Sequence, residues 1–160
     1  MCIRDRDNPI EVGADLIANA VAAYERFHDA CIVVDFGTAT TFTAVSAAAE
    51  FLGVAIAPGV NLAASALAGG TAQLPLTALT PPPRAIGTNT IHAIQSGVVL
   101  GYVGLVEGMI DRIRAELRED APVVATGGLS RLIAPLTDRF SDIDPWLTLD
   151  GIRLIALRNR

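Results

Sequence analysis

The segment Cys31-Ile32-Val33-Val34-Asp35-Phe36-Gly37-Thr38-Ala39-Thr40-Thr41-Phe42 decides the fold. Its first half is apolar and β-branched, which is typical of a buried strand. Asp35 ends this strand, and Gly37 allows a tight turn into a second extended run. The threonines place hydroxyls beside free backbone N–H groups, which suits phosphate oxygens, and Asp35 suits a cation. These residues alone slightly favour the alternative, an ordinary hairpin turn.

Composition limits the remaining choices. The chain has 160 residues, which suits one domain, and a formal net charge of −5 with scattered arginines, which argues against a nucleic-acid surface. All twelve basic residues are arginine, so a P-loop and lysine Schiff-base chemistry are excluded. No apolar run reaches membrane-spanning length, and the two cysteines form no disulfide framework, so we expect a cytoplasmic protein.

The hydrophobic pattern predicts an α/β chain. Apolar spacing indicates a helix from about residue 14 to residue 27, before the opening strand. After the threonine-rich turn, two more strands are expected to complete an antiparallel meander, typical of one half of a ribonuclease-H-like sheet. Further along we expect a short helix at 60–67, a loop at 71–88, a strand at 122–126, a helix at 129–139, an edge strand at 142–144 and a final helix at 149–158.

A long helix is predicted at residues 89–117, where apolar residues recur every three or four positions. A second stripe with similar spacing consists of Gly97, Gly101, Gly104 and Gly108. Each glycine inside a helix costs about 1 kcal/mol relative to alanine. We therefore expect close backbone contact along this stripe, either within the chain or with a second copy.

Three further positions have both a structural and a functional interpretation. Asp15, at the start of a helix, is by itself more typical of a cap than of a general base. Gly127-Gly128, between a strand and a helix, suits a nucleotide but is more often a plain turn. Thr90 opens the long helix, where Asn89 or Thr90 is a natural cap. Neither histidine has metal-ligand spacing.

The order of these motifs resembles type III pantothenate kinases, also described as Bvg accessory factor homologues. The resemblance spans residues 8–160, and residues 1–7 form a leader that it does not explain. The motifs are Glu-Val-Gly-Ala-Asp15, Val-Val-Asp35-Phe-Gly-Thr38, Ile-Ala-Pro-Gly59, Ile-Gly-Thr-Asn-Thr90, Gln-Ser-Gly97, Ala-Thr-Gly-Gly128 and Asp-Pro-Trp-Leu-Thr-Leu-Asp-Gly151.

The resemblance implies a ribonuclease-H-like half of the acetate-and-sugar-kinase/Hsp70/actin fold, a mixed sheet flanked by helices. It implies ATP-dependent phosphorylation of pantothenate to 4'-phosphopantothenate, the first step of coenzyme A biosynthesis. It also implies a cytoplasmic homodimer formed through the helix at 89–117, with no nucleic-acid or membrane partner. The expected cofactors are ATP, Mg²⁺ bound with it, and a monovalent cation, K⁺ or NH₄⁺.

The same resemblance assigns roles by position. Asp15 matches the proton acceptor for the pantothenate hydroxyl, within a substrate-binding motif that includes Gly13 and Ala14. Asp35 matches the monovalent-cation ligand. The other matches are pantothenate binding by Thr90 and ATP binding by Gly37, Thr38, Gly127 and Gly128.

Two features depart from the family pattern. Relatives begin with an Asp-x-Gly-Asn-Thr turn that holds phosphates, which is absent here, so we expect an N-terminally truncated member that is inactive alone. Relatives also carry arginine after Gly-Ala-Asp, where this chain has Leu16. Both departures keep open a second interpretation, a non-catalytic actin-like nucleotide-binding module or regulator.

Overall fold

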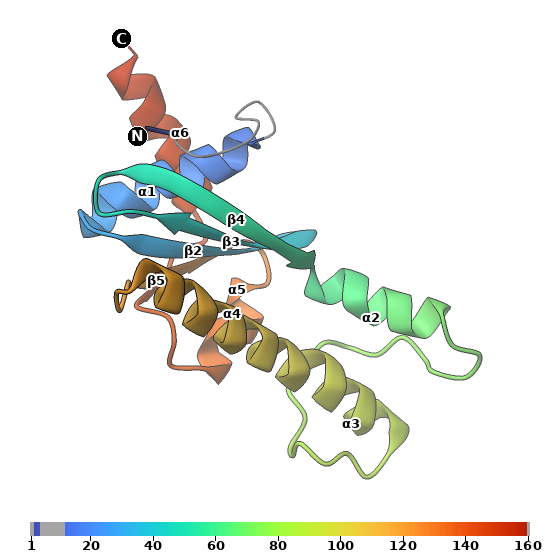
Figure 1. The fold of residues 1–160 in the computed structure, drawn as a ribbon. Helices are drawn as coiled ribbons and strands as arrows, with labels where there is room; N and C mark the ends of the chain where they lie inside the picture. The colour runs from blue at the N-terminus through green and yellow to red at the C-terminus, as the bar shows by residue number, and fades with distance from the viewer. Residues whose placement is uncertain (1, 4–11, 160) are drawn as a thin grey trace.

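A computed structural model describes residues 2–3 and 12–159 of the chain. In this part, six strands form one mixed sheet in the order β1-β4-β3-β2-β5-β6 (Figure 1). The strands are β1 (Cys2–Ile3), β2 (Cys31–Phe36), β3 (Ala39–Val45), β4 (Glu50–Pro58), β5 (Val123–Thr126) and β6 (Asp142–Ile143). The helices are α1 (Ala14–Phe27), α2 (Val60–Gly69), α3 (Thr90–Gln95), α4 (Gly101–Leu117), α5 (Ser130–Ile133) and α6 (Leu147–Arg158).

The predicted meander forms the centre of the sheet. Strand β3 pairs antiparallel with both β2 and β4, and β5 pairs parallel with the other edge of β2. Because side chains alternate along β2, Ile32 and Val34 enter one buried cluster and Cys31 and Val33 enter another. Burial, and then the charge of Asp29, raise the pKa of the Cys31 thiol to about 12, so this cysteine acts as a core residue.

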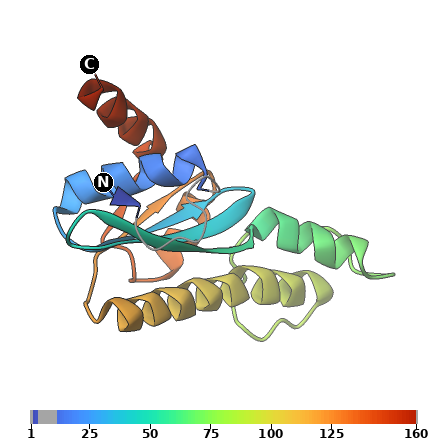
Figure 2. The same cartoon turned by 45° about the horizontal axis from the view of Figure 1, so that its top comes forward.

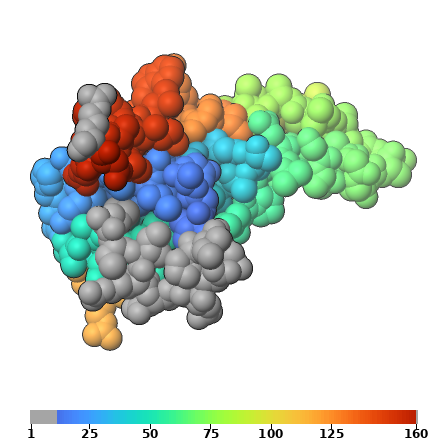
Figure 3. All heavy atoms as spheres, turned by 90° about the horizontal axis from the view of Figure 1, so that it is seen from above, coloured from blue at the N-terminus to red at the C-terminus, as the bar shows by residue number. Residues whose placement is uncertain are grey.

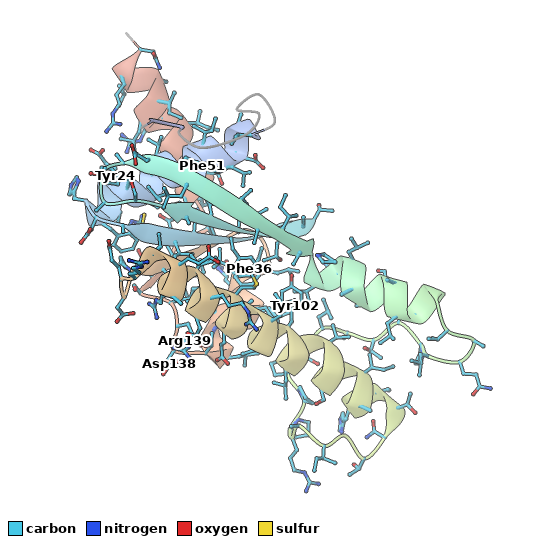
Figure 4. All side chains as sticks on the ribbon, in the orientation of Figure 1. Tyr24, Phe36, Phe51, Tyr102, Asp138 and Arg139 are labelled. Atoms are coloured by element: carbon cyan, nitrogen blue, oxygen red, sulfur yellow. The ribbon has the colours of Figure 1, made fainter. Side chains whose placement is uncertain are left out.

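Helices cover both faces of the sheet. Helices α1 and α6 pack together on one face, and α4 and α5 lie on the other (Figures 1 and 2). The labelled side chains follow this division: Phe51 enters the cluster beneath α1, and Phe36 and Tyr102 enter the cluster beneath α4 (Figure 4). Helix α2 and the following loop project from this three-layer body as an arm (Figure 3). This architecture confirms the predicted mixed sheet flanked by helices.

The predicted long helix is present as one continuous helix. Helices α3 and α4 are joined by a π-helical segment, Ser96–Leu100. The whole helix, Thr90–Leu117, is also long and apolar enough to span a membrane, but one of its sides packs onto the sheet through Val99, Val106 and Ile110. Tyr102 fixes this helix to the end of β4, because its hydroxyl donates a hydrogen bond to the Pro58 carbonyl at 2.7 Å.

The glycine stripe has no close partner within the described chain. A Cβ placed on Gly97, Gly101 or Gly104 would meet no atom within 4 Å, and at Gly108 it would meet only the Arg112 guanidinium at 3.1 Å. Residues 2–3 and 12–159 of the same chain are therefore ruled out as the close partner that was expected for this stripe. The stripe faces outward.

Two helix predictions were wrong in detail. The helix expected at 129–139 ends as α5 at Ile133 and continues only as a 3₁₀ turn, Ala134–Leu136, because Pro135 has no N–H to donate. The final helix begins two residues early, at Leu147, and its expected apolar side is largely exposed. It packs instead through Leu147 and Gly151, the latter because a Cβ there would lie 1.9 Å from the Ala18 carbonyl.

Candidate active site

Polar residues converge where β2 ends beneath α1. Asp35 is the second-last residue of β2, and its register partners are Thr41 on β3 and Thr126 on β5. Residues in register on adjacent strands point to the same face of a sheet, here the face covered by α1 and α6. The hydroxyl of Thr126, which is 1% exposed, has no hydrogen-bond partner among the described residues. The ends of these strands thus bring a carboxylate and two hydroxyl groups together.

The start of α1 supplies the second carboxylate. Gly13 is the N-cap residue without a capping side chain, and Gly13, Ala14 and Asp15 are all exposed. Asp15 Oδ1 accepts a hydrogen bond from the Leu16 N–H at 2.9 Å. A Cβ on Gly13 would lie 2.4 Å from this oxygen, so glycine leaves room for the carboxylate to fold back. Asp15 therefore satisfies one orphan N–H, as the structural interpretation expected, and stays accessible to a ligand.

Asp35 is held in a half-buried, electronegative setting. Burial raises the pKa of its carboxyl, the hydrogen bond from Asn19 lowers it, and the negative charge of Asp15 raises it. The two acids are therefore electrostatically coupled across α1 and β2. No arginine among the described residues forms an ion pair with either acid. Such a pair of carboxylates favours a bound cation.

Few of the described residues could act as ligands of a cation. No group of three or more histidine, cysteine or acidic side chains lies close enough to hold a metal within the described chain. The available donors are the free oxygen of Asp35 and the unpartnered Thr126 hydroxyl, both hard oxygen ligands. This set fits a weakly held cation that shares its coordination with a ligand or water better than a closed protein cage.

Two glycine-containing turns border Asp35. Gly127 has φ +87°, and a Cβ there would lie 2.5 Å from Asp35 Oδ1 and 2.7 Å from the Phe36 backbone, so only glycine fits. On the other side, the Gly59 N–H donates to the Thr38 carbonyl at 3.1 Å, which joins the threonine-rich turn to the start of α2. Both turns lie at the carboxyl ends of parallel strands, the usual position for a ligand.

An open cavity of about 510 Å³ lies between the two turns. It joins the threonine-rich turn to the glycine pair that was predicted to bind the nucleotide. Its lining residues are Phe36, Gly37, Thr38, Asn61, Leu62, Ser65, Gly128 and Leu129. The structure thus brings together all four predicted ATP-binding residues, with Gly127 directly beside the cavity and next to Asp35.

Thr90 is the predicted site residue that is not brought together with the others. It opens α3, on the opposite face of the sheet from α1 (Figures 1 and 2). Its neighbour Asn89 is the helix cap, because Asn89 Oδ1 accepts the His92 N–H at 2.9 Å. Capping therefore belongs to Asn89, and Thr90 remains exposed.

Sequence reasoning missed three polar residues of this region. Asn19 is 1% exposed and bonds Asp35, Thr148 bonds Asn19, and Thr126 lies in register with Asp35. One signal was present: Asn19 is an amide in the middle of an apolar helical segment, where an amide without partners is costly. Thr126 and Thr148 lie within two of the motifs that carry the family resemblance, but that resemblance assigned no role to either. The contact of Thr148 depends on how α6 packs against α1.

Comparison with known proteins shows the family of this chain. A family model described as Type III pantothenate kinase matches residues 3–112. A type III pantothenate kinase of Roseiflexus castenholzii is 54% identical over 154 residues, which is 96% of this chain and 60% of the relative. One of Myxococcus xanthus is 52% identical over 153 residues, with the same coverage. The chain thus spans about 60% of the length of these curated relatives.

Solved structures show the fold. A Campylobacter jejuni protein assigned to the Baf family of transcriptional activators has a TM-score of 0.63 at 22% identity, over 99% of this chain and 69% of that one. The Alp12 filament protein has a TM-score of 0.57 at 15% identity, over 91% and 52%. The chain has the ribonuclease-H-like fold of the acetate-and-sugar-kinase/Hsp70/actin class.

Proposed function

Because this chain belongs to the type III pantothenate kinase family, we propose that it carries the catalytic part of an ATP-dependent pantothenate kinase. The reaction makes 4'-phosphopantothenate, the first step of coenzyme A biosynthesis. The observation that carries the proposal is the juxtaposition of Asp15 and Asp35 beside two glycine turns, which leaves two coupled carboxylates without a cationic partner in the described chain. Phosphoryl transfer to an alcohol needs this combination of a base and a charge-neutralising site.

Asp15 is proposed as the proton acceptor. It is exposed at the start of α1, next to Gly13 and Ala14, where a primary alcohol can approach one carboxylate oxygen while Leu16 N–H holds the other. A carboxylate orients and deprotonates the attacking hydroxyl as the phosphoryl group is transferred. Gly13 and Ala14 are proposed as backbone contacts for the same substrate.

Asp35 is proposed as the ligand of K⁺ or NH₄⁺, next to the ATP phosphates. Gly37 and Thr38 supply backbone and hydroxyl donors from the threonine-rich turn, and Gly127 and Gly128 allow close approach of the nucleotide. A divalent ion, Mg²⁺, is proposed to arrive with ATP, because the described chain has no cluster of its own to hold one. When bound, these cations neutralise charge on the transferred group.

A homodimer in the cytoplasm is proposed as the working form. The exposed glycine stripe supports this, since close contact along it has no partner within the described chain. Thr90 is proposed to contact pantothenate, and its place on the opposite face from Asp15 means that it would reach such a site from a second copy (Figure 1).

A second candidate function rests on Leu16. This residue is 8% exposed and packs in the apolar cluster beneath α1, so it offers no charge to the carboxylate of pantothenate. A non-catalytic nucleotide-binding module would need no such charge. This candidate predicts binding of ATP without phosphorylation of pantothenate.

The test is a chimera in which this chain replaces the 154 matched residues of the R. castenholzii kinase. ATP-dependent phosphorylation of radiolabelled pantothenate is measured with K⁺, with Na⁺, and in Asp15→Asn and Asp35→Asn variants. We expect K⁺-dependent turnover that falls about 100-fold or more in Asp15→Asn, since a general base contributes that much. Asp138→Asn, an exposed acid far from α1 (Figure 4), is the control and should keep full activity.

An inactive chimera that still binds ATP would contradict the kinase proposal and support the non-catalytic module. The parental kinase, assayed in parallel, shows that the conditions support turnover. Equal activity in K⁺ and Na⁺, with Asp35→Asn unaffected, would contradict the cation role of Asp35 and leave the role of Asp15 intact.

A further inference from the structure

A buried amide connects the candidate site to the last helix. Asn19 lies in α1 with 1% of its surface exposed. Its Nδ2 donates a hydrogen bond to Asp35 Oδ2 at 2.9 Å, and its Oδ1 accepts one from the Thr148 hydroxyl at 2.7 Å. An amide buried without partners would be costly, and here both of its polar ends are satisfied. Three elements, α1, β2 and α6, therefore meet in one short hydrogen-bonded chain.

The chemistry of the three groups allows only one orientation of the amide. An ionised carboxylate accepts hydrogen bonds and donates none, so Asp35 must face the NH₂ end of Asn19. The amide oxygen is then left on the other side, where it requires a donor, and the Thr148 hydroxyl is that donor. Without this hydroxyl the buried amide oxygen loses its donor, and the bond to Asp35 alone is left to hold the side chain.

The orientation of Asn19 determines where the free oxygen of Asp35 lies. With Oδ2 bound by Asn19, Oδ1 lies 2.5 Å from the point where Gly127 would carry a Cβ, and 3.9 Å from the same point on Gly37. The free oxygen thus sits between the two turns that border the cavity. A rotation of the carboxylate would remove it from this position.

We infer that Asn19, oriented by Thr148, is a positioning residue that fixes the Asp35 carboxylate with Oδ1 directed between the Gly37 and Gly127 turns. The use of that oxygen as a cation ligand rests on the proposed function, whereas the positioning itself does not. Groups that orient a metal ligand commonly change metal affinity when they are altered, although they never touch the ion.

The packing of α6 against α1 determines the position of Thr148. Thr148 lies one turn before Gly151, whose contact with Ala18 brings α6 and α1 together without intervening side chains. The donor to Asn19 is therefore placed by the helix crossing itself. A shift of α6 along α1 changes the orientation of Asp35 through this chain of two hydrogen bonds.

The first experiment measures the positioning directly in this chain. Side-chain scalar couplings of Asp35 and solvent exchange of the Asn19 amide protons are recorded by NMR in the wild type and in Thr148→Val, Thr148→Ala and Thr148→Ser. We expect one Asp35 rotamer and slow amide exchange in the wild type and in Thr148→Ser. In Thr148→Val and Thr148→Ala we expect averaged couplings and faster exchange.

The matched control is Thr137→Val, which removes a threonine hydroxyl bonded to Glu107 at 2.7 Å on the opposite face of the sheet. It should leave the Asp35 couplings unchanged. Wild-type couplings in both Thr148→Val and Thr148→Ala would overturn the inference, since Asp35 would then be held without the Thr148 hydroxyl that is inferred to orient the amide. Two variants are used so that a folding defect in one leaves the other to decide.

The second experiment uses the K⁺ concentration that gives half-maximal phosphorylation in the chimera described above. Thr148→Val should raise this concentration about ten-fold, the lower end of the effect of altering a group that orients a metal ligand. The KM for pantothenate should stay within about two-fold, and Thr148→Ser should restore the wild-type value. An unchanged K⁺ requirement in Thr148→Val would overturn the inference. Absence of phosphorylation in every variant would instead refute the proposed function, and the couplings would still decide the positioning.

Discussion

The surroundings of Asp35 make the ionised form of its carboxyl unfavourable in the folded chain. Burial, the largest cause, and the charge of Asp15 raise the pKa of its carboxyl above the ordinary value of 3.8, and the hydrogen bond from Asn19 only partly offsets them. The unfolded chain ionises near pH 3.8, while the folded chain resists ionisation. Stability from this group is therefore fully present below that pH and is lost as the pH rises through the folded pKa.

Replacing Asp35 with asparagine should therefore stabilise the fold at neutral pH. Asparagine keeps an oxygen that can accept the Asn19 N–H, and it removes the buried charge. We expect thermal unfolding, followed by circular dichroism, to show a higher Tm for Asp35→Asn than for the wild type at pH 7, with the difference shrinking toward pH 3. Asp138→Asn controls for the loss of an acid as such. A variant that is less stable at pH 7 would contradict this account.

The adjacent glycines 127 and 128 give a second prediction at the residue scale. Gly127 has φ +87° and no room for a Cβ, whereas a Cβ on Gly128 would meet no atom within 4 Å. Gly127→Ala should lower the free energy of unfolding by about 1–3 kcal/mol, the range for a strained backbone position, and should displace Asp35 Oδ1. Gly128→Ala is the matched control and should change stability little. The free energy of unfolding of both variants is measured by urea denaturation. Equal losses of stability in the two variants would show that the backbone geometry of Gly127 is not required.

Among the elements, α6 shows how a helix face is selected. Its largest apolar residues, including Trp146 at its N-cap, Leu149 and Ile152, are exposed, and it packs through Leu147 and Gly151. A small residue allows two helix backbones to approach closely, and dispersion attraction between the two backbones then replaces the burial of larger side chains. Hydrophobicity alone therefore predicted the buried face of α6 only in part, since Leu154 packs against the core while Leu149 and Ile152 do not.

Gly151→Ala tests this crossing. A Cβ at this position would overlap the Ala18 carbonyl, so α6 must move, and we expect a loss of about 1–3 kcal/mol, as for overpacking. Gly69→Ala in α2 is the control, because a Cβ there would meet no atom within 4 Å and the variant should gain up to about 1 kcal/mol of helix propensity. In chemical denaturation, the free energies of unfolding of the two variants should change in opposite directions relative to the wild type. A neutral Gly151→Ala would contradict the tight crossing.

For the whole molecule, the exposed glycine stripe leads to a prediction about assembly. If Gly97, Gly101 and Gly104 contact a second copy, sedimentation velocity should show a dimer, and Gly101→Leu should shift it to the monomer without changing helix content. Ala156→Leu, an exposed position on α6, should leave the dimer intact. A wild-type monomer at all accessible concentrations would contradict the homodimer.

The sequence by itself determined most element types and the positions of the turns that border the candidate site. Local patterns decide these features: β-branched runs predict β2, β3 and β4, helical spacing predicts α1 and the long helix, and Gly37 and the pair at 127–128 indicate the turns. The motif order also indicated the family, and a family model matches residues 3–112. Such features depend on neighbours in the chain, so they can be read without the fold.

Only the tertiary structure decided which groups meet. The bonds from Asn19 to Asp35 and from Thr148 to Asn19 join residues 16 and 129 positions apart. The first depends on the packing of α1 on β2, and the second on the crossing of α6 over α1 at Gly151. The packing of α6 also left its larger apolar residues exposed, and the packing of the α3–α4 helix placed Thr90 on the opposite face from Asp15. Contacts at such separations depend on how helices cover the sheet, and no local pattern encodes that choice.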